Sequence, residues 1–114
     1  MQKVAFITGI SKGIGKAIAE LLLKKNYIVF GYSRTNTIKH PNFTFTKIDL
    51  SDLGKVQKLI FPKFDNSEIL LINNAARIGE ISPLNLKTEK GIIHDYNLNI
   101  ITPTLLCAKF INFF

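Results

Sequence analysis

A glycine-rich stretch near the start of the chain has residue types and spacing that suit anion binding: Thr8-Gly9-Ile10-Ser11-Lys12-Gly13-Ile14-Gly15. An apolar run precedes it and apolar residues at helical spacing follow it, which predicts a turn from a buried strand into a helix. The unpaired N–H groups and the positive dipole end of such a helix favour an anion. Gly15 is expected to let the helix pack closely on the strand. The stretch therefore predicts the phosphate-binding turn of a dinucleotide site, with a purely structural glycine turn as the alternative.

Two basic side chains indicate which dinucleotide this site prefers. Ser33 and Arg34 follow the second apolar run, where a dinucleotide-binding fold receives the adenosine ribose. An acid at that point accepts hydrogen bonds from the ribose 2′-OH and favours NAD, whereas a base accommodates a 2′-phosphate. This chain has no acid there, and Lys12 adds a second cation. Because Arg binds phosphate bidentately, we expect NADP(H) in preference to NAD(H), with a surface Arg that has no role as the alternative.

Strand-like and helix-like segments alternate along the chain and must position these residues. We expect strands at residues 3–8, 27–32, 43–48 and 68–72, and a loop at 33–42. Ser51 is expected to cap a short helix over residues 52–61, which Pro62 ends. A long helix is expected from Thr88 to near the last residue. The first helix should stop at Asn26, and its apolar face at i, i+3, i+4, i+7 and i+8 is made of Ile14, Ala17, Ile18, Leu21 and Leu22.

This order of elements predicts the fold class. Strands that alternate with helices favour a parallel sheet, and nearly continuous apolar runs suit strands that are buried on both faces. Right-handed crossovers then leave few topologies. We expect an α/β fold of the Rossmann type, with a four-stranded parallel sheet in the order 3-2-1-4 and flanking helices, as one domain over residues 1–114.

Composition narrows the class of protein. The chain has 114 residues, of which 46% are hydrophobic and 20% charged, and it carries a net charge of +7. Its lysines are scattered, so a solvated surface or an anionic cofactor explains the charge better than a nucleic-acid partner. Cys107 excludes an internal disulfide and is expected to be buried in an apolar helix. His40 and His94 give no metal-ligand spacing. No run suits a membrane span or a signal peptide, so we expect a cytoplasmic protein.

Four markers in order give the chain a family resemblance. The glycine loop is spaced T-G-x-x-x-G-x-G, Asp49-Leu50 ends the third strand, Asn73-Asn74-Ala75-Ala76 ends the fourth, and Asn99 lies in the following helix. With these residues the chain resembles the short-chain dehydrogenase/reductase family, which has N-N-A-G after its fourth strand and a catalytic Asn in the next helix. Residues 73–84 and 99–103 also resemble benzil or sepiapterin-type reductases.

The resemblance implies a cofactor site. Asp49 would hold the adenine amino group, Leu50 would pack against its ring, and Asn74, Ala75 and Ala76 would line the ribose nearest the nicotinamide. Ala76 stands where the family has Gly; its methyl group costs little at negative φ but brings strain of about 1 kcal/mol or more at positive φ. The implied cofactor-binding residues are Gly9, Ser11, Lys12, Gly13, Ile14, Gly15, Ser33, Arg34, Asp49, Leu50, Asn74, Ala75 and Ala76.

Asn99 also has a local argument. Pro103 lies four residues later and has no N–H, so it cannot bond to the Asn99 carbonyl, and its ring opens that turn. This predicts a kinked helix with a free carbonyl at Asn99. In the resembled family that carbonyl holds a water of the proton relay. The alternative is a polar helix residue near a kink.

The remaining catalytic residues of the resembled family are missing. Carbonyl reduction in the family needs Ser, Tyr and Lys beside the Asn, with the last two spaced Y-x-x-x-K. The three tyrosines have no such partner, since Gly31, Asn36 and Ile100 follow Tyr27, Tyr32 and Tyr96 by four residues. We therefore expect the N-terminal half of the fold. Its fourth strand would have an open apolar edge, so we expect poor solubility or association, and the family suggests a homo-oligomer.

Three functions follow from the sequence. The first is an NADP(H)-dependent oxidoreductase that acts on a carbonyl or alcohol, represented by its N-terminal half. The second is a non-catalytic NADP-binding fragment, or a subunit that depends on a partner and has no turnover of its own. A basic nucleic-acid binder ranks last. The absence of the Tyr-Lys pair separates the first two, because a chain without it should bind cofactor but not turn over.

Overall fold

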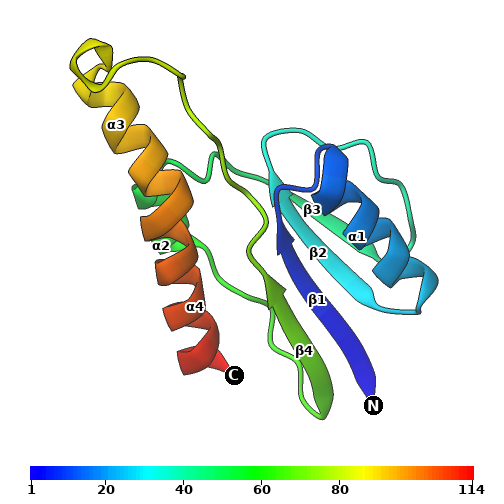
Figure 1. Ribbon diagram of the computed structural model, residues 1–114. Helices are drawn as coiled ribbons and strands as arrows, with labels where there is room; N and C mark the ends of the chain where they lie inside the picture. Colours follow the sequence, from blue (N-terminus) through cyan, green and yellow to red (C-terminus); the bar gives the residue numbers. More distant parts are fainter.

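Four strands form one parallel sheet in the computed structural model, which describes residues 1–114 (Figure 1). The strands are β1 (Gln2–Thr8), β2 (Ile28–Ser33), β3 (Phe43–Lys47) and β4 (Ser67–Ile72). Their order is β3-β2-β1-β4, with every pair parallel, which confirms the predicted topology. In register, Val4 of the central strand β1 lies between Ile28 and Ile69. The carboxyl ends of the strands therefore meet at one edge of the sheet.

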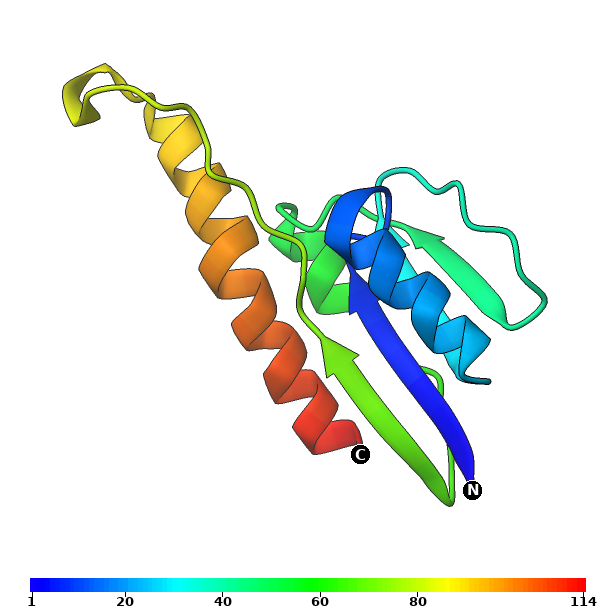
Figure 2. The same cartoon turned by 45° about the vertical axis from the view of Figure 1, so that its right-hand side comes forward.

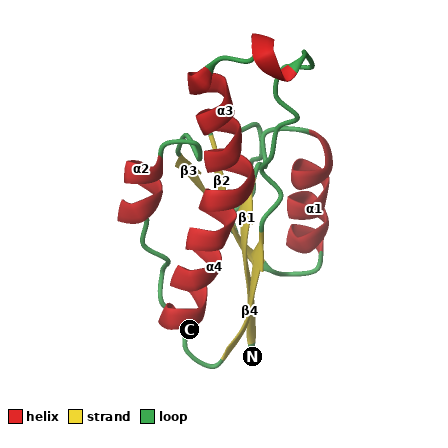
Figure 3. Cartoon of the chain, turned by 60° about the vertical axis from the view of Figure 1, so that its left-hand side comes forward, coloured by secondary structure: helices red, strands yellow, loops and turns green.

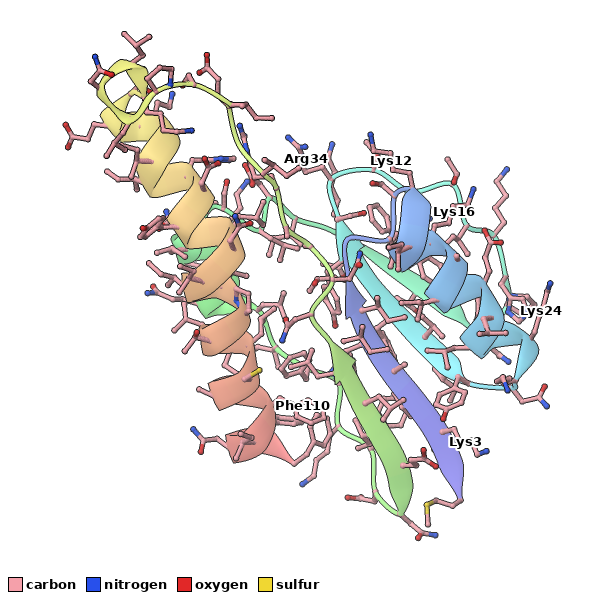
Figure 4. The ribbon with its side chains drawn as sticks, viewed as in Figure 1. Lys3, Lys12, Lys16, Lys24, Arg34 and Phe110 are labelled. Carbon is pink, nitrogen blue, oxygen red and sulfur yellow. The ribbon has the colours of Figure 1, made fainter.

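Helices cover both faces of the sheet (Figure 3). Helix α1 (Gly13–Lys24) lies on one face, and α2 (Leu53–Lys58) lies on the other beside the long helix formed by α3 (Glu89–Tyr96) and α4 (Thr102–Phe113). Each face has its own apolar core. On the α4 side the core is largely aromatic: Phe6 stacks on Phe30 at 5.2 Å between ring centroids, and Phe110 points toward this cluster (Figure 4).

The apolar face of α1 differs from the sequence prediction. Gly15, Ala19 and Leu23 are buried, whereas Ile14 is 73% exposed and Leu21 is 52% exposed. Helix and sheet approach most closely where the side chains are smallest, so Gly15 and Ala19 face the sheet and the larger Ile14 turns away. Asn26, at φ +64°, ends the helix as expected.

Helix α2 is shorter than predicted and has a different cap. The N-cap is Asp52, whose carboxylate accepts a hydrogen bond from the Lys55 N–H at 3.2 Å. Ser51 donates its hydroxyl to Asp49 instead, so the prediction of Ser51 as the cap was wrong. The helix ends at Lys58, well before Pro62, and the Lys109 ammonium of α4 donates to the Gln57 and Leu59 carbonyl oxygens at this end. These contacts satisfy carbonyls that another helical turn would have used.

Cys107 is exposed, which contradicts the prediction that it is buried. The buried residues of α4 are Thr102 and Leu106. Cys107 lies next to this stripe but about 100° around the helix from Leu106. Its sulfur lies 3.3 Å from the amide nitrogen of Asn73. An apolar sequence around a cysteine does not establish which side of the helix is covered.

The helix before Pro103 contains a π-helical turn over Asn97–Ile101, where we had predicted a kink. The Thr102 N–H bonds to the Asn97 carbonyl, five residues back. The two flanking helices continue as one rod without a sharp bend (Figures 1 and 2). The distortion before Pro103 is therefore a wider helical turn and not the predicted kink. A free carbonyl at Asn99 stays a prediction.

Strand β4 is an edge strand in the described chain. The segment that follows it and the outer side of the long helix carry exposed apolar side chains, among them Ile78, Ile81, Ile93, Ile100 and Ile111. Association through these surfaces stays a prediction. None of the helices is both long enough and apolar enough to cross a membrane.

Tyr32 of β2 sets an expected alkaline limit on the stability of this fold. Its side chain is 4% exposed, and burial raises the pKa of the phenol well above its ordinary value. The folded pKa is the higher one, so the neutral phenol stabilises fully below about pH 10, the unfolded pKa, and this stability is lost as the pH rises further. We expect Tyr32→Phe to reduce that loss in urea unfolding measured from about pH 8 to about pH 11.

Tyr96→Phe is the matched control, because Tyr96 is 61% exposed. This variant should keep the pH dependence of the unsubstituted chain. An alkaline loss of the same size in Tyr32→Phe would contradict the prediction.

Candidate functional site

A cavity of about 630 Å³ lies where the carboxyl ends of the strands meet. Ten of the predicted cofactor residues line it: Gly9, Ser11, Lys12, Ser33, Arg34, Asp49, Leu50, Asn74, Ala75 and Ala76. Gly13, Ile14 and Gly15 do not line it. Five further lining residues were missed by the sequence analysis: Thr35, Ile48, Arg77, His94 and Leu98. Three of these are chain neighbours of predicted residues, which could have indicated them, whereas His94 and Leu98 come from the long helix and had no sequence signal.

The glycine loop leaves the start of α1 open toward solvent. Lys12 is the N-cap residue and makes no side-chain capping hydrogen bond, so the first helical N–H groups have no side-chain partner. Gly9 and Gly13 have φ values of +75° and +63°. Residues other than glycine rarely adopt this backbone conformation. The space beside Gly13 is empty within 4 Å of where a Cβ would stand. The loop therefore offers free donors and room for an anion.

Two side chains join the glycine loop to the segment after β4. The Thr8 hydroxyl oxygen accepts hydrogen bonds from the backbone N–H groups of Asn74 and Ala75, both at 3.0 Å. The Asn74 side-chain amide donates to the Gly9 carbonyl at 2.9 Å. Gly15 lies against this bond, since a Cβ there would overlap the Gly9 oxygen and the Asn74 amide nitrogen. Gly15 therefore supports the cavity from behind without lining it.

Ala76 is not strained, although it stands where the resembled family has Gly. The only residues other than glycine with positive φ are Asn26 and Asn66. Ala76 thus has a backbone conformation that any residue adopts, and its methyl group needs no compensation elsewhere.

Positive charge gathers at one rim of the cavity. Lys12 and Arg34 are exposed and point outward at the same end of the molecule (Figure 4). Neither forms an ion pair, in contrast to Lys16, which pairs with Glu20. Ser33, which also lines the cavity, donates its hydroxyl to the Thr35 carbonyl at 2.5 Å. The two cations are therefore available to an anionic group at this rim.

Asp49 is the one carboxylate that lines the cavity. One of its oxygens, Oδ1, accepts both the hydroxyl and the backbone N–H of Ser51, at 2.6 and 3.0 Å. These hydrogen bonds lower the pKa of Asp49 against the opposing effect of burial, and the neighbouring His94 and Arg34 side chains lower it further. The carboxylate is thus held ionised, with its second oxygen free of these contacts and able to accept a hydrogen bond from a ligand.

Asn99 lies beside the cavity but does not line it. Its side-chain amide makes two hydrogen bonds to the backbone of Arg77, accepting from the N–H at 2.9 Å and donating to the carbonyl at 2.7 Å. The Arg77 guanidinium in turn lies 2.8 Å from a carboxylate oxygen of Asp95 and 3.1 Å from the Nδ1 atom of His94. The segment after β4 is thereby fixed to the long helix. Nowhere in residues 1–114 do three His, Cys, Asp or Glu side chains come together as a metal site would need.

Comparison with known proteins gives a consistent result. A family model described as short chain dehydrogenase matches residues 3–114. Benzil reductase ((S)-benzoin forming) of Bacillus subtilis is 35% identical over 91% of this chain, which corresponds to 46% of the reductase. The chain spans about half the length of the curated relatives it matches.

Solved structures share the fold. A short-chain dehydrogenase/reductase from Burkholderia vietnamiensis superposes with a TM-score of 0.79 at 27% identity, over 97% of this chain and 56% of that protein. A variant of ElxO with NADPH bound has a TM-score of 0.77 at 26% identity, over 98% of this chain and 50% of that protein.

Proposed function

Because this chain belongs to the short-chain dehydrogenase family, we propose that it binds NADP(H) in the cavity and forms the cofactor-binding part of an oxidoreductase for carbonyl or alcohol substrates. The pyrophosphate would lie at the open start of α1, where helix N–H groups lack a capping side chain. The adenine would lie against Leu50, with its amino group donating to Asp49. Asn74, Ala75 and Ala76 would face the ribose nearest the nicotinamide. The residues present therefore fit a nicotinamide dinucleotide.

The preference for NADP(H) is supported by two basic side chains at the rim, Lys12 and Arg34, that form no ion pair. Lys12 and Arg34 line the same cavity and have no carboxylate partner. No acid follows β2 that would accept hydrogen bonds from a ribose 2′-OH. Two cations beside a 2′-phosphate favour the phosphorylated cofactor through charge and through the bidentate hydrogen bonds of the guanidinium.

A titration of the purified chain with NADPH and with NADH tests this preference. We expect NADPH to bind at least about tenfold more tightly, and we expect the difference to shrink as salt is added, since the cations are exposed. Equal affinity for the two cofactors would overturn the preference. Failure to bind either one would overturn the proposed function.

The reaction proposed for the whole protein is inferred from its relatives. NADPH, when bound, would supply the hydride for reduction of a carbonyl, and the 35% sequence identity to benzil reductase supports a carbonyl substrate. Asn99 is proposed to have a supporting role through its place in the helix beside the cavity. No tyrosine lines that cavity, and the chain has no Y-x-x-x-K pair.

The absence of a tyrosine and lysine pair at the cavity favours a second candidate for the chain itself. Residues 1–114 would bind cofactor without converting substrate. The proton donor would come from a partner chain or from further sequence of the whole protein. NADPH oxidation by the purified chain with a panel of ketones tests this candidate. We expect no steady turnover, and sustained oxidation would show that another group donates the proton.

A further inference from the structure

The π-helical turn Asn97–Ile101 and its neighbour Thr102 contact two segments that contribute residues to the cavity lining. One segment, residues 49–51, follows β3, and the other, residues 74–77, follows β4. Both are fixed to this turn and its neighbour Thr102 by side-chain hydrogen bonds to backbone atoms. The contact between Asn99 and Arg77 described above holds the β4 side.

Two other side chains hold the β3 side. The Thr102 hydroxyl donates to the Leu50 carbonyl at 2.5 Å and is buried, with 2% of the residue exposed. The Asn97 side-chain amide donates to the Ser51 carbonyl at 3.3 Å. Ser51 is also the residue that holds Asp49 Oδ1. The long helix therefore holds Leu50 and Ser51, and Ser51 holds the Asp49 carboxylate that is proposed to recognise adenine.

The π-turn explains why Asn97 and Thr102 reach the same segment. In a regular α-helix, residues five apart lie about 140° apart around the axis, so only one of them would face residues 49–51. The hydrogen bond from the Thr102 N–H to the Asn97 carbonyl brings the two residues nearly above one another. Asn99, between them in sequence, bonds to the Arg77 backbone in the segment after β4.

We propose that Thr102, assisted by Asn97, is a positioning residue that aligns Asp49 and Leu50 for the adenine ring and thereby sets the base selectivity of the cofactor site. The proposal rests on the proposed function. Its physical basis is that an oriented carboxylate distinguishes an amino group, which donates a hydrogen bond, from a carbonyl oxygen, which does not. A small shift of residues 49–51 would remove that alignment while the phosphate contacts at the glycine loop remain.

The test compares NADPH with its hypoxanthine analogue, which has an oxygen in place of the adenine amino group, by direct titration. We expect the unsubstituted chain to favour NADPH by roughly tenfold, as for loss of one hydrogen bond to a charged group. Thr102→Val keeps the side-chain shape but removes the hydroxyl, and should reduce this ratio to about twofold or less. Thr102→Ser keeps the hydroxyl and should restore it.

Thr104→Val is the matched control. Thr104 lies in the same helix and is exposed, and its hydroxyl bonds to Ile100 of that helix, away from the cavity walls. It should keep the selectivity of the unsubstituted chain. Asn97→Ala removes the longer hydrogen bond, from the half-buried Asn97 side chain to the Ser51 carbonyl. Its selectivity ratio provides the test if Thr102→Val does not fold.

The outcomes are distinguishable. A lower ratio in Thr102→Val, or in Asn97→Ala if only that variant folds, supports the proposal. Equal weakening of both ligands, or a lower melting temperature with an unchanged ratio, assigns Thr102 a merely structural role and overturns it. Absence of binding in the unsubstituted chain is a failure of the proposed function itself, and the positioning role falls with it.

Discussion

Replacing Gly15 with alanine is expected to weaken NADPH binding by at least about a hundredfold and to destabilise the fold by about 1–3 kcal/mol, the usual cost of overpacking. A Cβ at this position would overlap the Gly9 carbonyl oxygen and the Asn74 amide nitrogen, and it would lie 2.9 Å from the Gly9 carbonyl carbon. The neighbouring atoms are backbone and a hydrogen-bonded amide, so none can move without breaking the bond between Gly9 and Asn74. The same displacement would move α1 away from the glycine loop and misdirect its N–H groups.

Gly54→Ala is the matched control for this prediction. The only atom near a Cβ at position 54 is an Asp52 carboxylate oxygen at 3.4 Å, and Gly54 is exposed in α2. Alanine there should stabilise the helix by up to about 1 kcal/mol without affecting cofactor binding. Urea unfolding and NADPH titration of both variants make the comparison. Binding within a few-fold of the unsubstituted chain in Gly15→Ala would show that the close contact is not required.

The second large effect is expected from Arg34→Asp, which should reverse the cofactor preference. The carboxylate would repel a 2′-phosphate and accept hydrogen bonds from a ribose 2′-OH. We expect NADPH affinity to fall about a hundredfold, as when a bidentate charged contact is lost and repulsion replaces it, while NADH affinity rises or stays unchanged. Titration of both cofactors at two salt concentrations measures the change.

Lys39→Asp controls for the change in net charge. Lys39 is exposed in the loop between β2 and β3 and does not line the cavity. It should weaken both cofactors by similar, small factors that vanish at high salt. If Arg34→Asp weakened NADPH and NADH equally, Arg34 would act only through long-range charge, and the assignment to the 2′-phosphate would be wrong.

Local features of the sequence were sufficient for the topology. Alternation of apolar strands with helical segments, together with right-handed crossovers, predicted the observed order β3-β2-β1-β4. Markers at strand ends were also informative, because parallel strands bring their carboxyl ends to one edge. This is why residues as far apart in sequence as Lys12, Arg34, Asp49 and Asn74 line one cavity, as their positions had suggested.

Details that depend on side-chain volume and on contacts between elements were not predictable. The apolar periodicity of α1 favoured a face with Ile14, yet the fit against the sheet turned Gly15 inward. Ser51 had the residue type of a helix cap, but α2 begins at Leu53, so Asp52 occupies the cap position and Ser51 donates its hydroxyl to Asp49. The exposure of Cys107 likewise followed from which side of α4 the sheet covers.

The glycine loop and the strand order were thus determined by the sequence itself, because they depend on backbone conformations and patterns within short segments. The tertiary structure decided which contacts fix the segments that line the cavity. A proline with no N–H predicted a local distortion before Pro103, but only packing decided that it would be a π-turn. The π-turn brings Asn97 and Thr102 to Ser51 and Leu50, and it brings Asn99 to Arg77. These contacts join residues more than 20 positions apart, and no periodicity along the chain encodes them.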